Sequence, residues 1–162
     1  MDVYDDSFLN LWRTLNNTGV KYIMVGGFAT NFHGYQRYTG DIDILIEDTV
    51  LNRQQLRKAF FDLGMGDYES MDSLQFIPGW VDFTLHNGVR LDILTSLEGV
   101  NISFNECLQI SPVAEIEGIF VPFLHINQLI ANKKKVNRPK DQIDVIELEK
   151  IRAILEERNG RV

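Results

Sequence analysis

Two adjacent glycines, followed by two aspartates inside an apolar run, constrain this chain more than any other feature. The stretch GGFATNFHGYQRYTGDIDILIE begins at Gly26, directly after one apolar run, and places Asp41 and Asp43 inside the next. Strands usually avoid aspartate. Side chains alternate across a strand, so both aspartates point to one face while Ile42 and Ile44 point to the other. We therefore expect a strand with one core face and one carboxylate face.

Two neighbouring carboxylates repel each other unless a cation lies between them. Mg²⁺, or Mn²⁺, is the obvious candidate, because Mg²⁺ binds carboxylate oxygens together with substrate phosphates. The strand pattern VRLDIL at 89–94 supplies a third carboxylate, Asp92, since Leu91 and Ile93 face the core. If the two strands are neighbours, the three carboxylates form one cluster that could hold metal and activate a hydroxyl for attack on a phosphate. Asp82 is the rival third member, and we prefer Asp92 because its strand alternates more cleanly.

The glycine pair is of the kind that binds a phosphate group. A strand that ends in Gly26 and Gly27 and continues into a helix exposes backbone N–H groups at a positive helix end. The missing side chains allow a triphosphate to approach closely. Thr39 and Arg37, just before the aspartates, could add a hydroxyl and a cation. Each motif alone is weak, but in this order they predict a metal and nucleotide site.

Charge narrows the class of ligand. The chain has 162 residues, a formal net charge of −7 and a pI near 4.9. A protein that wraps nucleic acid is normally basic, because phosphate contacts supply most of that affinity. Positive charge is concentrated between Lys133 and Lys140, which favours a nucleotide over a long polynucleotide without excluding RNA.

The basic segment leaves two alternatives open. At least two of the lysines 133–135 are expected to solvate a helix C-terminus, where cations are favoured; Lys133 is nevertheless a candidate for the nucleotide. Lys140 could reach a nucleotide phosphate or pair with Asp144 one helical turn later. Asp141 and Asp144 are expected at the helix start and on the surface rather than at the metal site.

The remaining pattern predicts one α+β domain over residues 1–162, with a core of about 20–122 and C-terminal helices over about 125–157. Asn87-Gly88 and Glu117-Gly118 are hairpin turns, and Trp12 and Trp80 are expected in the core or an interface. Helices are predicted at 7–17, 28–32, 50–63, from 125 to the lysine run and at 139–157; strands are predicted at 20–25, 41–47, 74–77, 81–85, 89–94, 113–116 and 119–121.

The sequence contains no membrane-length apolar run, and its N-terminus is acidic, so neither a membrane span nor a signal peptide is expected. The single cysteine, Cys107, allows no internal disulfide. A reducing cytoplasm is the expected location.

The order strand, Gly-Gly, helix, Asp-x-Asp and a later single aspartate resembles the DNA polymerase β-like nucleotidyltransferase superfamily. The fuller pattern looks like small bacterial nucleotidyltransferase-like proteins related to abortive-infection and toxin–antitoxin components. The matching segments are GGFATNFHGYQRYTGDIDILI, RLDILTSLEG, VPFLHINQLIANKK and RPKDQIDVIELE, which together span most of residues 20–149. The resemblance implies a nucleotidyltransferase fold, with a small mixed sheet carrying the carboxylates, flanking helices and a C-terminal helical segment.

The resemblance also assigns roles to residues. Gly26 and Gly27 match the phosphate-binding turn, Asp41 and Asp43 match metal ligands, and Asp92 matches the third carboxylate, which commonly acts as general base. The implied activity is metal-dependent transfer of a nucleoside monophosphate from an NTP to a hydroxyl, with release of pyrophosphate.

One position departs from the superfamily pattern. Phe28 stands where a serine usually follows the glycines. No second substrate-binding domain is evident either. The alternative is therefore a non-catalytic nucleotide-binding or toxin–antitoxin partner module with the same fold, and a small helical protein or a second copy of the chain is a candidate partner. A protein side chain, a tRNA end, an antibiotic and a small metabolite all remain open as acceptors.

Overall fold

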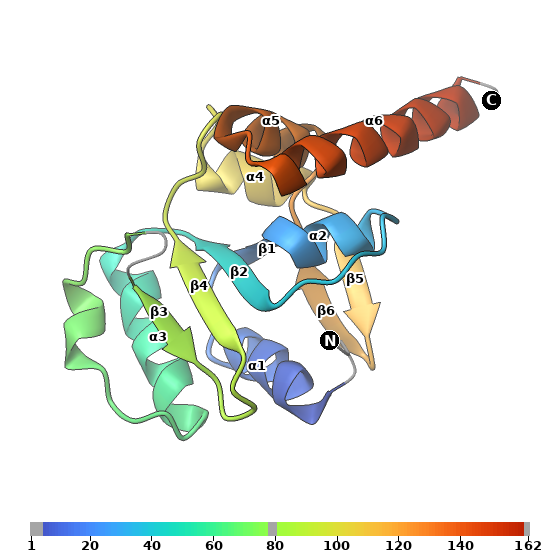
Figure 1. Ribbon diagram of the computed structural model, residues 1–162. Coiled ribbons are helices and arrows are strands. Elements are labelled where there is room, and N and C mark those ends of the chain that lie inside the picture. Colours follow the sequence, from blue (N-terminus) through green and yellow to red (C-terminus); the bar gives the residue numbers. More distant parts are fainter. Residues whose placement is uncertain (1–4, 78–80, 161–162) are drawn as a thin grey trace.

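The computed structural model describes residues 5–77 and 81–160 and forms a mixed α+β fold (Figure 1). Trp80 lies outside these residues. The strands are β1 (Tyr22–Val25), β2 (Asp41–Ile46), β3 (Asp82–Thr84), β4 (Arg90–Leu94), β5 (Val113–Ile116) and β6 (Ile119–Pro122). The helices are α1 (Asp6–Asn17), α2 (Gly26–Phe32), α3 (Val50–Asp62), the 3₁₀ helix η1 (Glu69–Asp72), α4 (Phe104–Ile110), α5 (Ile126–Val136) and α6 (Pro139–Asn159).

Four strands form the sheet that carries the predicted site, in the order β1-β2-β4-β3. Strands β2 and β4 run parallel, whereas β1 pairs with β2 and β3 pairs with β4 in the antiparallel sense. The predicted hairpin of β5 and β6 forms a separate two-stranded sheet, joined to β1 by a bridge between Met24 and Phe123. The expected mixed sheet is therefore confirmed.

The core lies on one face of this sheet. Ile42, Ile44 and Ile46 are fully buried, as the alternation along β2 predicts. Figure 1 shows α1 and α3 side by side against the sheet, and both contribute buried side chains to the same core. Trp12 of α1 is buried and stacks on Tyr22, as expected for a core residue. On the opposite face of β2, Leu45 is buried as well, whereas Asp41 and Asp43 are only partly buried.

The two C-terminal helices pack against each other near α2 (Figure 1). Helix α5 ends at Asn137, whose left-handed conformation (φ 59°) turns the chain. Helix α6 then starts with Pro139 in its first turn, and Asp141 accepts hydrogen bonds from the backbone N–H and the guanidinium of Arg138. The turn between the helices thus brings the start of α6 back toward the sheet.

One predicted strand is wrong, and two helices in the structure were not predicted. The segment 74–77 is not a strand, because the Arg53 guanidinium, rather than a neighbouring strand, binds the carbonyl of Leu74. Helix α4 was not predicted, although Ser103 and Glu106 form a capping box at its start. The short helix η1 was not predicted either. No helix in the described part of the chain has the length and apolar character needed to cross a membrane.

Candidate active site

The carboxylates meet because β2 and β4 are neighbours in register. Asp43 lies opposite Asp92, and Asp41 lies opposite Arg90. Since the strands are parallel, equivalent positions present their side chains to the same face. The structure therefore brings Asp41, Asp43 and Asp92 to one face, as predicted. Asp82 lies opposite Asp92 on the next strand, β3, so the rival candidate is also a neighbour.

The two glycines allow close contact between the start of α2 and these acidic strands. Gly26 has φ +65°, and a Cβ added there would overlap the Asp43 carboxylate, with Cγ only 3.0 Å away. A Cβ on Gly27 would lie 2.5 Å from Thr39 Oγ1 and 2.9 Å from Thr39 Cβ. Glycine is thus required at both positions by Asp43 and Thr39, two of the predicted site residues.

The change Gly27→Ala is expected to lower the free energy of unfolding by about 1–2 kcal/mol, because the new Cβ overpacks against Thr39. Alanine in place of glycine would otherwise favour a helix. Gly40→Ala is the matched control, since its Cβ would meet only the Tyr38 ring and hydroxyl, at 3.6 Å or more. Urea unfolding of both variants tests this prediction, and equal stability of the two would contradict it.

A basic side chain lies among the carboxylates. Arg90 Nη2 is 3.3 Å from Asp41 Oδ2 and 3.2 Å from Asp92 Oδ2, and Arg90 Nε is 3.3 Å from Asp82 Oδ2. Within residues 5–77 and 81–160, no three histidine, cysteine or acidic side chains are arranged as a ready metal site. Two of the three predicted metal ligands thus contact a guanidinium in this structure.

Burial and mutual repulsion make Asp43 an unusual carboxylate. Burial, with the neighbouring charges of Asp92 and Asp41, raises the pKa of Asp43 to about 7. Burial also raises the pKa of Asp92, although Arg90 opposes that rise. Among the described residues, Asp92 Oδ1 is buried and has no hydrogen-bond partner. A buried acceptor without a donor is costly, and a cation would satisfy it, so these carboxylates fit a divalent metal chemically.

The raised pKa of Asp43 predicts a pH-dependent stability difference. Folding favours the protonated form, so as the pH rises from about 4 through 7 the wild-type protein loses stability that the variant Asp43→Asn keeps. Without metal at pH 8, we expect the variant to be more stable by about 2–4 kcal/mol. The difference should shrink toward zero at pH 4. Urea unfolding with EDTA at several pH values measures it, and a difference that does not change with pH would contradict the prediction.

A buried ionic network lies behind the carboxylates. Asp144 of α6 is fully buried, accepts two hydrogen bonds of 2.7 Å from the Arg37 guanidinium and lies 2.7 Å from Lys133 Nζ. Burial alone would raise the pKa of Asp144, but the hydrogen bonds from Arg37 and Lys133 outweigh burial and lower it. Asp144 therefore fixes two of the cations predicted to bind nucleotide.

Asp141 completes the network. It is fully buried, accepts hydrogen bonds from the Arg138 backbone and guanidinium, and lies 3.7 Å from Lys133 Nζ. The predicted helix start is confirmed for Asp141, but the predicted surface location of Asp141 and Asp144 is wrong. Charged groups are rarely buried unless they are paired, and their partners come from segments that the local sequence does not reveal.

Two of the three lysines at 133–135 lie at the helix C-terminus in solvent as predicted, and the third is buried. Lys134 and Lys135 are exposed in the last turn of α5, as expected, whereas Lys133 is only 4% exposed. The ion pairs of Asp144 go to Arg37 and Lys133 rather than to Lys140. Lys140 is exposed and remains available to a ligand.

One cavity of about 180 Å³ gathers all the predicted site residues. It also contains three residues that were not predicted: Gly40, Arg90 and Arg138. Arg90 could have been found, because it stands two residues before Asp92 and therefore on the same strand face. The lining residues are Gly26, Gly27, Arg37, Thr39, Gly40, Asp41, Asp43, Arg90, Asp92, Lys133, Arg138 and Lys140.

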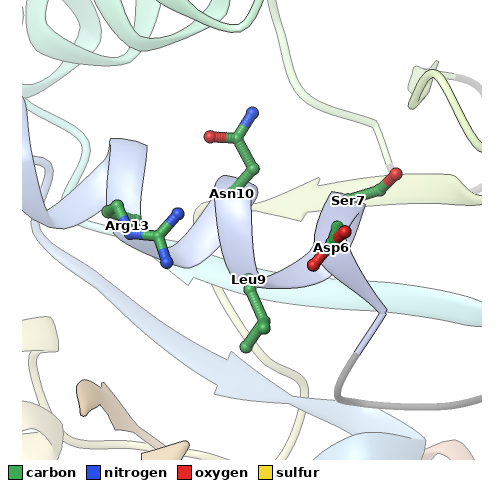
Figure 2. A pocket seen from close by; sticks show the side chains of 5 residues that line it. All are labelled: Asp6, Ser7, Leu9, Asn10 and Arg13. Atoms are coloured by element: carbon green, nitrogen blue, oxygen red, sulfur yellow. The ribbon is translucent and has the colours of Figure 1, made fainter. Parts of the chain in front are cut away.

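A larger hollow of about 380 Å³ lies elsewhere, along α1. Figure 2 shows that its five lining side chains point in different directions from a single helix. They do not converge on a common ligand position, and the hollow contains none of the predicted residues. The residues are Asp6, Ser7, Leu9, Asn10 and Arg13.

Phe28 belongs to the core. Its side chain is buried, and its ring centroid lies 5.8 Å from that of Phe8. The Thr39 hydroxyl instead lies against Gly27. A hydroxyl group is therefore present beside the turn, although it comes from the segment before β2.

Comparison with known proteins identifies the family of the chain. Residues 4–162 match the family described as "Nucleotidyl transferase of unknown function (DUF2204)", and the chain belongs to this family. No curated protein sequence matched the chain. The family and the fold together confirm the predicted relationship to the DNA polymerase β-like nucleotidyltransferases.

Solved structures support the fold. The lincosamide antibiotic adenylyltransferase LnuA, solved with lincomycin, has a TM-score of 0.62 and 17% identity; the match covers 91% of this chain and 97% of LnuA. The antibiotic-resistance factor ANT(2″)-Ia has a TM-score of 0.57 and 18% identity, with 94% and 91% covered. A putative nucleotidyltransferase from Thermotoga maritima has a TM-score of 0.51 and 15% identity, with 92% and 90% covered.

Proposed function

We propose that this protein is a metal-dependent nucleotidyltransferase that transfers a nucleoside monophosphate from an NTP to a hydroxyl group. The observation that carries the proposal is the composition of the cavity. Its lining includes two glycines at a strand–helix turn, three carboxylates and five basic side chains, in a protein of net charge −7. Basic groups around a carboxylate cluster suit a metal-bound polyphosphate.

The glycine side of the cavity would bind the phosphates. The backbone at Gly26 and Gly27 is free of side chains, and Thr39 adds a hydroxyl beside it. Arg37 and Lys133 are held in place by Asp144, so they offer positive charge with little freedom of movement. Lys140 is the exposed cation that can move toward a phosphate. Fixed donors and charges stabilise phosphoryl transfer without reorganisation during the reaction.

The carboxylate side would carry the chemistry. Asp41, Asp43 and Asp92 are the residues that would hold Mg²⁺ or Mn²⁺, and the bound ion would neutralise phosphate charge and lower the pKa of the acceptor hydroxyl. Asp92 would accept the hydroxyl proton as general base, because it faces the same cavity as the other two carboxylates.

The reaction balances with these groups. A bond forms between the acceptor oxygen and the α-phosphorus, and the bond from that phosphorus to the oxygen bridging the β-phosphate breaks. The electron pair of the broken bond leaves with pyrophosphate. The hydroxyl proton passes to Asp92 and then to solvent.

The identity of the acceptor is to be found by experiment. LnuA is described as a lincosamide adenylyltransferase, and ANT(2″)-Ia was solved with adenylyl-2″-tobramycin. Small hydroxylated antibiotics are therefore the first acceptors to test, followed by small metabolites, RNA ends and proteins. The second copy of the chain or the small helical partner expected from the sequence would be needed if none of these is modified by the isolated protein.

The test is pyrophosphate release from each of the four NTPs with Mg²⁺, in the presence of lincomycin, tobramycin, tRNA or a cell extract. Mass spectrometry of the acceptor should then show an added nucleoside monophosphate. Binding of an NTP without release of pyrophosphate in the presence of any of these acceptors would contradict catalysis. That result would favour the nucleotide-binding module, a reading consistent with the burial of Phe28 in the core.

A further inference from the structure

Arg90 occupies the position where the proposed metal ligands converge. Its Nη2 atom lies 3.3 Å from Asp41 Oδ2 and 3.2 Å from Asp92 Oδ2, so one nitrogen contacts two of the three carboxylates. Its Nε atom lies 3.3 Å from Asp82 Oδ2 on the neighbouring strand. The guanidinium thus acts as a counter-cation for an acidic cluster that has no other cation in direct contact with both Asp41 and Asp92 among the described residues.

A divalent ion and this guanidinium compete for the same oxygens. Mg²⁺ binds carboxylate oxygens closely, and a guanidinium that contacts both Asp41 and Asp92 places a positive charge beside the same two carboxylates. The arginine is also an incomplete partner, because Asp92 Oδ1 remains buried without a donor from residues 5–77 and 81–160. Arg90 therefore offsets only part of the negative charge of the cluster and leaves one of its oxygens without a partner.

The Arg90 guanidinium can leave Asp41 and Asp92 and still contact Asp82. Its side chain is 45% exposed, and that of Asp82 is 41% exposed. Asp82 belongs to β3, the outer strand of the sheet, and contacts Nε rather than Nη2. A rotation of the outer part of the side chain can free Asp41 and Asp92 while the contact with Asp82 persists.

We infer that Arg90 is the resident counter-cation of the metal-free site, and that a divalent metal binds by displacing its guanidinium from Asp41 and Asp92. The inference rests on the proposed function, because it takes these carboxylates as metal ligands. It adds a property that metal binding alone does not imply: Arg90 weakens the binding of metal to the nucleotide-free protein.

The test is a calorimetric titration of Mn²⁺ into the nucleotide-free protein, comparing wild type with Arg90→Gln. Removal of the competing cation should tighten Mn²⁺ binding about tenfold or more, equivalent to about 1.4 kcal/mol. Without metal, the variant should melt at a lower temperature, since Asp41, Asp82 and Asp92 lose their counter-cation. Mn²⁺ should then raise its melting temperature more than that of wild type.

Lys140→Gln is the matched control. Lys140 lines the same cavity and carries the same charge, but within residues 5–77 and 81–160 it forms no ion pair with the three carboxylates. It should tighten Mn²⁺ binding less than threefold, the part due to net charge. Equal effects of the two variants would overturn the inference, as would unchanged or weaker Mn²⁺ binding in Arg90→Gln.

The same measurements distinguish failure of the inference about Arg90 from failure of the proposed function. If neither wild type nor Arg90→Gln binds Mn²⁺, the inference fails and so does the metal assignment. If both bind Mn²⁺ with equal affinity and pyrophosphate release still requires metal, only the inference about Arg90 fails.

Discussion

Replacing Asp43 with asparagine is expected to slow nucleotidyl transfer at least about a thousandfold, equivalent to about 4 kcal/mol of transition-state stabilisation. Asparagine keeps the shape of the side chain but removes the charge that would hold the metal beside the glycine turn. The same variant should be more stable than wild type at pH 8 without metal, because Asp43 is buried with a raised pKa. Loss of activity combined with gain of stability is typical of a residue retained for function.

Initial rates of pyrophosphate release, measured with the identified acceptor, test this expectation. Asp82→Asn is the control, since Asp82 contacts Arg90 but is not a proposed metal ligand. It should slow transfer less than about tenfold, the range of a single indirect electrostatic contact. If Asp43→Asn releases pyrophosphate at the wild-type rate, the assignment of Asp43 to the active site is wrong. A larger loss from Asp82→Asn than from Asp92→Asn would instead make Asp82 the third carboxylate.

Replacing Asp144 with alanine is expected to lower the free energy of unfolding by about 3–5 kcal/mol, because it leaves Arg37 and Lys133 without their common partner. Most of this loss of stability is expected from Lys133, because its side chain is only 4% exposed. The same change frees the Arg37 guanidinium from its two hydrogen bonds, so NTP affinity should fall as well.

Urea unfolding compares this variant with Asp62→Ala, which removes an exposed carboxylate paired with Lys58. An exposed pair one helical turn apart contributes only about 0.3–0.5 kcal/mol. A loss in Asp144→Ala as small as that in Asp62→Ala would show that the buried network does not stabilise the fold.

Much of the site could be predicted because it depends on local patterns. The alternation of Asp41 and Asp43 with isoleucines fixes which face of β2 they occupy, whatever the rest of the fold. The same argument applies to Asp92 on β4, and only the pairing of the two strands had to be supplied by the structure. The glycines were predictable because a turn from strand to helix needs backbone freedom at Gly26.

The unpredicted features depend on contacts between distant segments. Asp144 seemed a surface residue because its own helix offers polar neighbours, yet its partner Arg37 lies 107 residues earlier in the chain. The segment 74–77 has the composition of a strand, but Arg53, from another element, takes its carbonyl. Arg90 was overlooked for a different reason: its position on the carboxylate face was readable, but its contacts to three aspartates were not.

The most direct test of the central claim is a thermal-shift panel of ATP, GTP, CTP and UTP, each with and without Mg²⁺, on wild type and Asp43→Asn. Each shift is taken from the protein's own melting temperature, because the variant is expected to differ in stability before any ligand is added. A ligand that binds only the folded state raises the melting temperature by mass action. We expect a Mg²⁺-dependent rise with at least one NTP in wild type and its loss in Asp43→Asn. No rise with any NTP, or the same rise in the variant, would contradict a metal–nucleotide site at these aspartates.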